Sequence, residues 1–224
     1  MKKILVLGTM FLVAICANAQ FMRAEELEKY SKEKYGDKWV EAAQNLKSQL
    51  TLDKNNSLTY SQVIDCGEKT KDELYIILNL WFTMSFNDAN SVIKLNDKQA
   101  GTIIGQGFVE SIASHVGGLT AYDISIKPII KVDIKDKKIR VTYTIQYYDA
   151  TLVKGGGFLG SRNSATQVEE KWPIEQCFPF VDKDKHKKTS SKALVMSHAY
   201  SNVIMDKIEE AVKNGVTGNE TNDW

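Results

Sequence analysis

The first patterned stretch of the chain, at 23–50, predicts two short helices. Leu27 and Tyr30 recur at the spacing of one helix face, and Gly36 suits the position just after a helix end. A second apolar stripe follows, with Asp37 as its expected N-cap. Both stripes are narrow and mixed, which favours helices packed on their own domain over an arm that binds a partner.

A strand and a longer helix are predicted next. Positions 58–64 alternate apolar and polar residues, as a half-buried strand does. Thr70 and Glu73 have the spacing of a capping box, so a helix should begin there and continue to about Phe86. Apolar residues surround most of this helix, and we therefore expect it to be central and buried.

The stretches 92–96 and 102–109 are predicted to pair as a hairpin, because the polar segment between them ends in Gly101, a residue suited to a turn. The pattern at 109–116 fits either a strand or a helical turn. Periodicity does not decide between these two alternatives.

The most regular alternation runs from Ile124 to Tyr147 and predicts another hairpin, with its turn at Asp136-Lys137. This register places Asp133 opposite Arg140, a favourable cross-strand pair. It also gathers apolar residues on one face, by pairing Ile134 with Ile139, Val132 with Val141 and Ile130 with Tyr143. One buried and one wet face are typical of an antiparallel sheet with helices on one side.

The C-terminal part predicts a glycine-rich excursion at 154–165, an edge strand or connection at 172–180, and a last helix from about 190 to 214. Two prolines favour the edge position, because proline cannot donate to a central ladder. A polar tail follows at 216–224.

The N-terminus has the pattern of a secretory signal peptide. Lys2 and Lys3 precede a charge-free run that is too short for a spanning helix, and Ala17-Asn18-Ala19 is a small-residue cleavage signal. We expect the mature chain to begin at Gln20 and to be periplasmic, extracellular or associated with the outer membrane. The alternative is a retained membrane anchor. No later apolar stretch reaches the length of about 18 residues that a membrane span needs.

The order of elements, together with three short stretches of sequence, resembles a known family. The chain is similar to exported bacterial proteins of unknown function with a TATA-binding-protein-like (TBP-like) fold, common in the Bacteroidetes. The stretches are Asp72-Glu73-Leu74-Tyr75 with Trp81, Asn96-Asp97 through Gly101-Thr102-Ile103-Ile104-Gly105-Gln106-Gly107, and Lys131-Val132-Asp133-Ile134-Lys135-Asp136 with Ile139-Arg140-Val141. The resemblance covers 58–148, and by architecture the closing helix.

The resemblance implies an α+β fold, in which an antiparallel sheet has helices packed on one face and a β-α-β4-α core follows the N-terminal helices. It also implies a location outside the cytoplasm. It implies no activity, and the fold name says nothing about DNA, because function belongs to sites rather than folds. The expected division is a signal peptide at 1–19, a helical segment at 20–52, the TBP-like domain at 53–215 and a tail at 216–224.

Composition narrows the classes of function. The 224 residues include 29 Lys and Arg against 28 Asp and Glu. Cleavage would remove two lysines and leave 27 basic against 28 acidic residues, a net charge of −1. This balance excludes a polycationic nucleic-acid binder, and 43% hydrophobic with 25% charged residues excludes a disordered tail or a multi-span membrane protein.

Export would leave two cysteines, Cys66 and Cys177, in an oxidising compartment. They could form one disulfide that closes a loop of about 110 residues and stabilises the fold by about 4–5 kcal/mol, or they could be two separate buried thiols. The sequence leaves both alternatives open, because pairing needs Cα atoms within about 7 Å. We expect no metal site at either cysteine. Ile15 before Cys16 disfavours a lipid anchor.

The sequence shows no catalytic motif. The histidines, His115, His186 and His198, lack a paired nucleophile signature and the H-E-x-x-H spacing. The glycine-rich segment continues as Ser161-Arg162, without the Lys-Ser/Thr pair and the helix of a phosphate-binding loop. We therefore expect no cofactor and no enzymatic activity.

The leading functional hypothesis is a non-catalytic binding or interaction module for a protein, a glycan or a small molecule. The contact would be made by the polar sheet face or by the 154–165 loop, with Phe158, Leu159 and Arg162 as candidate contact residues. The alternative is a carrier of an apolar ligand between the sheet and the last helix, and an unrecognised hydrolase comes third. Large residues on both sides of that space, such as Tyr143 and Tyr200, favour the module. No nucleic-acid partner is expected.

Overall fold

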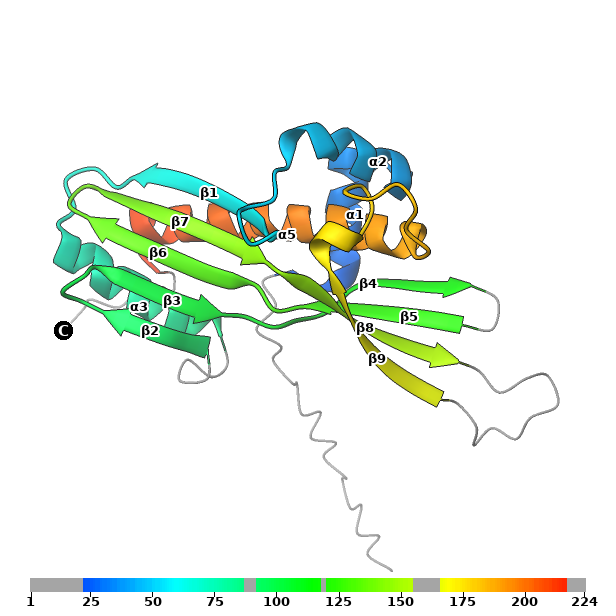
Figure 1. The fold of residues 1–224 in the computed structure, drawn as a ribbon. Helices are drawn as coiled ribbons and strands as arrows, with labels where there is room; N and C mark the ends of the chain where they lie inside the picture. The colour runs from blue at the N-terminus through cyan, green and yellow to red at the C-terminus, as the bar shows by residue number, and fades with distance from the viewer. Residues whose placement is uncertain (1–21, 87–91, 118–119, 155–165, 217–224) are drawn as a thin grey trace, which may run out of the picture.

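Nine strands form two antiparallel sheets in the computed structural model, which describes residues 22–86, 92–117, 120–154 and 166–216 (Figure 1). The orders are β1-β7-β6-β3-β2 and β4-β5-β8-β9. The strands are β1 (Leu58–Asp65), β2 (Ile93–Asp97), β3 (Thr102–Gln106), β4 (Val109–Gly117), β5 (Thr120–Ile126), β6 (Ile129–Lys135), β7 (Lys138–Ile145), β8 (Tyr147–Lys154) and β9 (Thr166–Pro173). The helices are α1 (Ala24–Tyr35), α2 (Trp39–Leu46), α3 (Lys71–Ser85) and α5 (Lys187–Asn214), with 3-10 turns at Lys47–Gln49 and Ile174–Gln176.

Three long strands pass from one sheet into the other with only a short break each. Gly107 and Phe108 separate β3 from β4, Lys127 and Pro128 separate β5 from β6, and Gln146 separates β7 from β8. The Gly107 amide donates to the Pro128 carbonyl at 2.9 Å and so joins two of the breaks. Proline cannot donate to a ladder, which interrupts regular pairing here. We call this region the junction of the sheets (Figure 1).

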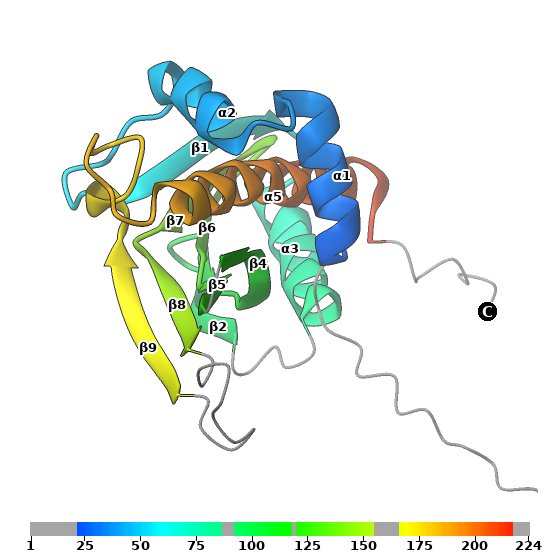
Figure 2. The same cartoon turned by 90° about the vertical axis from the view of Figure 1, so that its right-hand side faces the viewer.

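The helices lie on one side of the strands (Figure 2). The long helix α5 contacts β1 of the five-stranded sheet and β4 and β5 of the four-stranded sheet. The N-terminal helices α1 and α2 pack mainly on α5, and α3 packs on α5 and β6. Gly105 of β3 allows the close approach of α3, because a Cβ atom there would lie 2.5 Å from the Phe82 ring.

The structure confirms the predicted register of the central hairpin. Ile134 pairs with Ile139, Val132 with Val141 and Ile130 with Tyr143. Arg140 Nη2 lies 2.7 Å from Asp133 Oδ2. The capping box of Thr70 and Glu73 is also confirmed, and Gly36 is the C-cap of α1 with φ 94°.

Several predictions were wrong in detail. The N-cap of α2 is Lys38, without a side-chain cap, and not Asp37. Of the two alternatives left open for the stretch after 109, the strand is the correct one, and it forms β4. The alternation from Ile124 to Tyr147 is not one hairpin, because β5 and β8 belong to the second sheet. The helix α3 is only half-buried, since Ile76 is 63% exposed on its outer side.

A group of polar side chains lies where α5 packs on the core, and His198 of α5 is one of them. His198 lies between the rings of Tyr35 and Tyr60, with ring centroids 5.3 Å away on each side. Its Nδ1 atom and the Tyr143 hydroxyl are buried without a hydrogen-bond partner among the described residues. Burial, and secondarily the charge of Lys34, lowers the pKa of His198 to about 4.

We expect the stability of the fold to decrease as the pH falls from about 6.5 to about 4. In this range the unfolded chain binds a proton at residue 198 that the folded chain does not bind. Urea unfolding should give about 2 kcal/mol less stability at pH 4.5 than at pH 7 from this group alone. In His198→Gln the corresponding part of the pH dependence should disappear. Identical pH profiles of the two proteins would contradict the assignment.

Candidate ligand-binding cleft at the junction of the sheets

A cleft of about 430 Å³ lies beside the junction, on the face of the four-stranded sheet that points away from α5. The alternation of the strands makes this face polar: Tyr148, Ala150 and Leu152 of β8 are buried, so Asp149 and Thr151 point to the opposite side. The lining residues are Phe108, Ser125, Lys127, Asp149, Ala150, Thr151, Glu169, Glu170 and Lys171.

Strand register brings these side chains together from three parts of the chain. Asp149 of β8 pairs with Ser125 of β5 on one side and with Lys171 of β9 on the other. Thr151 pairs with Glu169 of β9 in the next row. Directly opposed residues on one face have Cβ atoms about 4.5–5.5 Å apart. The cleft therefore has a floor of alternating hydroxyl, carboxylate and ammonium groups.

The central charges of the cleft form an ion pair. Lys127 Nζ lies 2.9 Å from Asp149 Oδ2, and the side chains are 43% and 24% exposed. This ion pair raises the pKa of Lys127. Glu169 and Lys171 are exposed at the outer edge of the floor. Positive and negative groups are thus interleaved, and the cleft presents both donors and acceptors.

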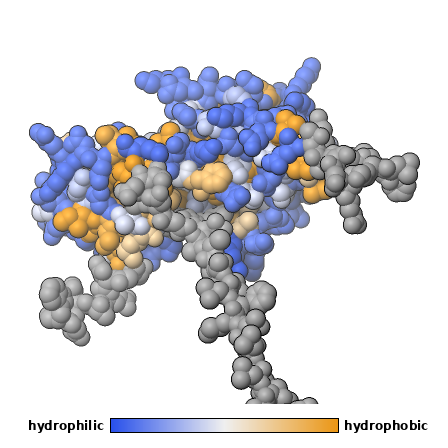
Figure 3. All heavy atoms as spheres, turned by 90° about the horizontal axis from the view of Figure 1, so that it is seen from below, coloured by the Kyte–Doolittle hydropathy of each residue, from blue (hydrophilic) through white to orange (hydrophobic). Residues whose placement is uncertain are grey.

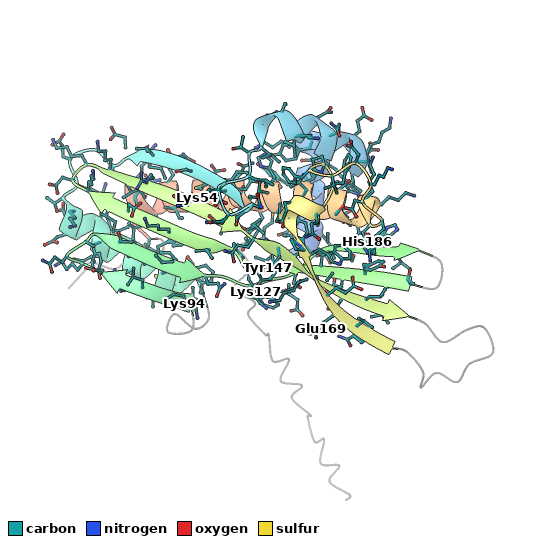
Figure 4. All side chains as sticks on the ribbon, in the orientation of Figure 1. Lys54, Lys94, Lys127, Tyr147, Glu169 and His186 are labelled. Carbon is teal, nitrogen blue, oxygen red and sulfur yellow. The ribbon has the colours of Figure 1, made fainter. Side chains whose placement is uncertain are left out.

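Two aromatic rings flank this floor. Phe108 follows β3 at the junction, and its side chain is 57% exposed with Lys127 Nζ 5.7 Å from the ring centroid. Lys171 Nζ lies 4.5 Å from the ring centroid of Tyr147. Figure 4 shows Lys127 and Tyr147 near the passage from β7 to β8, and Glu169 further along β9.

A β-bulge shapes the edge of the same sheet. The pairing of β4 with β5 shifts between Val109 and Ala113, and Ser111 has φ 51°. The Ser111 hydroxyl donates to Asp123 Oδ2 at 2.9 Å, and its amide donates to the Ser125 hydroxyl at 3.2 Å. A left-handed backbone at a serine is unusual, and such bulges redirect side chains near functional sites.

Exposure alone does not single out Phe108. Apolar patches on the face seen from below are separated by hydrophilic side chains (Figure 3). The exposed large apolar side chains of the described residues are Val63, Ile76, Met84, Leu95, Phe108, Val116 and Val153. Single exposed apolar residues are ordinary. Phe108 is the member of this set that lines the cleft, whereas Val63 lines a smaller pocket of about 190 Å³ with charged residues of β6 and β7.

Cys66 and Cys177 are separate buried thiols in the described residues, the second of the two alternatives left open by the sequence. Lys69, close to Cys66 in the sequence, donates from Nζ to the Lys213 carbonyl at the end of α5. The Phe178 amide, next to Cys177, donates to Asp184 Oδ2 just before α5. A helix of 28 residues is about 42 Å long, so the thiols lie near opposite ends of the domain.

The other sequence candidates have different outcomes. Phe158, Leu159 and Arg162 lie outside the described residues. His186 stacks on Trp172 with ring centroids 4.3 Å apart, and His115 lines a separate pocket beside α2 and α5. No group of three or more His, Cys, Asp or Glu in the described ranges could hold a metal ion. In the same ranges no helix has the length and apolar character to cross a membrane.

The cleft residues escaped sequence reasoning. Lys127, Asp149 and Lys171 are far apart along the chain and belong to no motif. The one available signal was Pro128, which interrupts an alternating stretch and marks a break in the ladder.

This fold defines a class of α+β domains in which bent antiparallel strands carry helices on one face. Residues 60–148 match the family described as "Domain of unknown function (DUF4468) with TBP-like fold". This confirms the resemblance and the fold class predicted from the sequence. The match assigns no catalytic or other specific activity.

Two solved structures are similar to the chain. One is a TBP-like protein from Parabacteroides distasonis ATCC 8503, with a TM-score of 0.48 and 14% identity over 73% of this chain and 97% of that chain. The other is a DUF4468 family protein from Bacteroides ovatus ATCC 8483, with a TM-score of 0.44 and 14% identity over 71% of this chain and 88% of that chain. No curated protein matches the chain.

The thiols give a direct test of the core. Burial raises the pKa of both thiols, that of Cys177 to about 12, which keeps them protonated and unreactive in the folded protein. A thiol reagent should therefore react slowly with the native protein produced from Gln20 onward, and it should titrate two thiols after unfolding without reductant. Titration of no thiols under these conditions would show a disulfide instead.

Proposed function

We propose that this protein is an exported, non-catalytic binding module that takes its ligand in the cleft at the junction of the sheets. The observation that carries the proposal is an exposed aromatic ring, Phe108, beside a floor of paired charges and hydroxyls. A concave site with an apolar wall and a few convergent polar groups is the usual form of a ligand site.

The chemistry of the cleft favours a glycan. Sugar hydroxyls both donate and accept, and the floor offers donors from Lys127 and Lys171 and acceptors from Asp149 and Glu169. The positive and negative charges of the floor nearly balance. The cleft therefore repels neither cationic nor anionic ligands strongly, and it suits a neutral polar chain. The apolar face of a sugar ring can pack on Phe108. The cleft is open at the surface, as recognition of a long chain requires.

The interior offers little to the alternative of an apolar-ligand carrier. Tyr143, Tyr148 and Tyr200 fill the space between the sheets and α5 with almost fully buried rings. A carrier needs that space for its ligand.

A glycan array with the mature protein should show binding to neutral oligosaccharides. Phe108→Ser and Asp149→Asn should each weaken that binding about tenfold, since a ring contact and a charged hydrogen bond each contribute about 1.4 kcal/mol. Val63→Ser is the matched control, because Val63 is 65% exposed but lies outside this cleft.

An equal loss in Val63→Ser would contradict the placement of the site. Mass spectra of the bound glycan should be unchanged after incubation with the protein. A cleaved product would replace the binding module by the hydrolase hypothesis.

Export has its own test. N-terminal sequencing of the protein from its own cells should begin at Gln20, because the Ala17-Asn18-Ala19 signal directs cleavage after Ala19. A sequence that begins at Met1 would overturn the export proposal and leave the cleft proposal standing.

A further inference from the structure

A second pocket, of about 320 Å³, lies between the start of α2, strand β4 and the start of α5. Its lining residues are Lys38, Trp39, Val40, Ser114, His115, Lys188 and Lys192. The lining contains three lysines and a histidine and no carboxylate. The charges therefore have one sign, in contrast to the mixed charges of the junction cleft. Its volume suits a small molecule.

The ring of Trp39 forms the apolar wall and lies among cations. Lys192 Nζ and Lys32 Nζ are each 5.7 Å from its centroid. Both ammonium groups also contact one carboxylate, Glu28, at 2.7 and 2.6 Å. The single carboxylate of Glu28 is thus shared by two ammonium groups. The Lys192 side chain is only 15% exposed, which limits screening of its charge by water.

The remaining lysines of the pocket are weakly compensated. Lys38 lies 3.7 Å from Glu41 Oε2, with both side chains mostly exposed, and such pairs contribute little. Lys188 is exposed and has no ion pair with any described residue. It stands in the first turn of α5, which contains no acidic residue and has no side-chain cap. The charge of Lys188 opposes the helix dipole. Asp184, just before the helix, accepts hydrogen bonds from the His186 amide and the Ser190 hydroxyl.

We propose that this pocket binds a small aromatic anion, with its charged head between Lys38 and Lys188 and its ring against Trp39. An anionic head relieves the repulsion among the lysines, and His115 supplies one more hydrogen-bonding group. The apolar ring replaces water on Trp39 and Val40. The site is separate from the junction cleft, so each proposal can fail without the other.

The experiment is isothermal titration calorimetry of the mature protein with phenyl phosphate, phenol and inorganic phosphate. Phenyl phosphate should bind more tightly than either part alone, and its affinity should decrease with added salt. Lys188→Glu and Lys38→Glu should each weaken it about tenfold or more. The matched control is Lys54→Glu, an exposed lysine of a polar turn that lies outside the pocket (Figure 4).

Three results would overturn the proposal: no heat of binding with phenyl phosphate, equal affinity for phenol, or an equal loss in Lys54→Glu. Lys188→Met serves as a second variant if charge reversal impairs folding, and it should also weaken phenyl phosphate. Phe108→Ser should leave this affinity unchanged.

Discussion

The packing of α5 beneath both sheets is the interaction on which the rest of the structure depends. The helix has 28 residues and contacts strands of each sheet, and α1, α2 and α3 pack on it in turn. Burial of apolar surface is the dominant favourable contribution to folding. Because one helix provides that burial along its whole length, three strands can bend between the sheets without dividing the core. The helix also carries His198 near its centre, and the Nδ1 atom of this residue has no hydrogen-bond partner among the described residues, so a pH-dependent cost lies within the same interface.

The bend separates the roles of the two sheet faces. Gly107, Pro128 and Gln146 interrupt the ladder, and side chains beside them converge on the open face where the strands change direction. The covered face must be apolar to pack on α5, so polar side chains are confined to the opposite face. This constraint accounts for the positions of Lys127, Asp149 and Lys171. Side chains that point away from α5 beside a break form a concave surface, and no additional loop is needed. The fold thus places the cleft, and the side chains of three strands determine its chemistry.

The sequence predicted the faces of the strands better than their partners. A pattern of period two fixes which side chains are buried, and the register from Ile130–Tyr143 to Ile134–Ile139 was correct for that reason. The same parity continues through Ile124 and Ile126, so alternation could not show that β5 pairs in another sheet. The cleft needs that pairing, and the pairing of β9, before its residues meet. Local signals were accurate for the capping box at Thr70, whereas the separation of Cys66 from Cys177 depends on the length of α5 in space.

Binding and folding can be tested separately because the cleft contributes little to stability. An ion pair as exposed as Lys127–Asp149 is worth about 0–1 kcal/mol, and Phe108 leaves more than half of its surface in water. Stability therefore does not account for an apolar ring placed beside paired charges at this position. The same reasoning applies to Lys188, whose charge opposes the start of α5. Both surfaces hold residues that the fold does not need, which is the physical reason for which we propose a ligand at each of them.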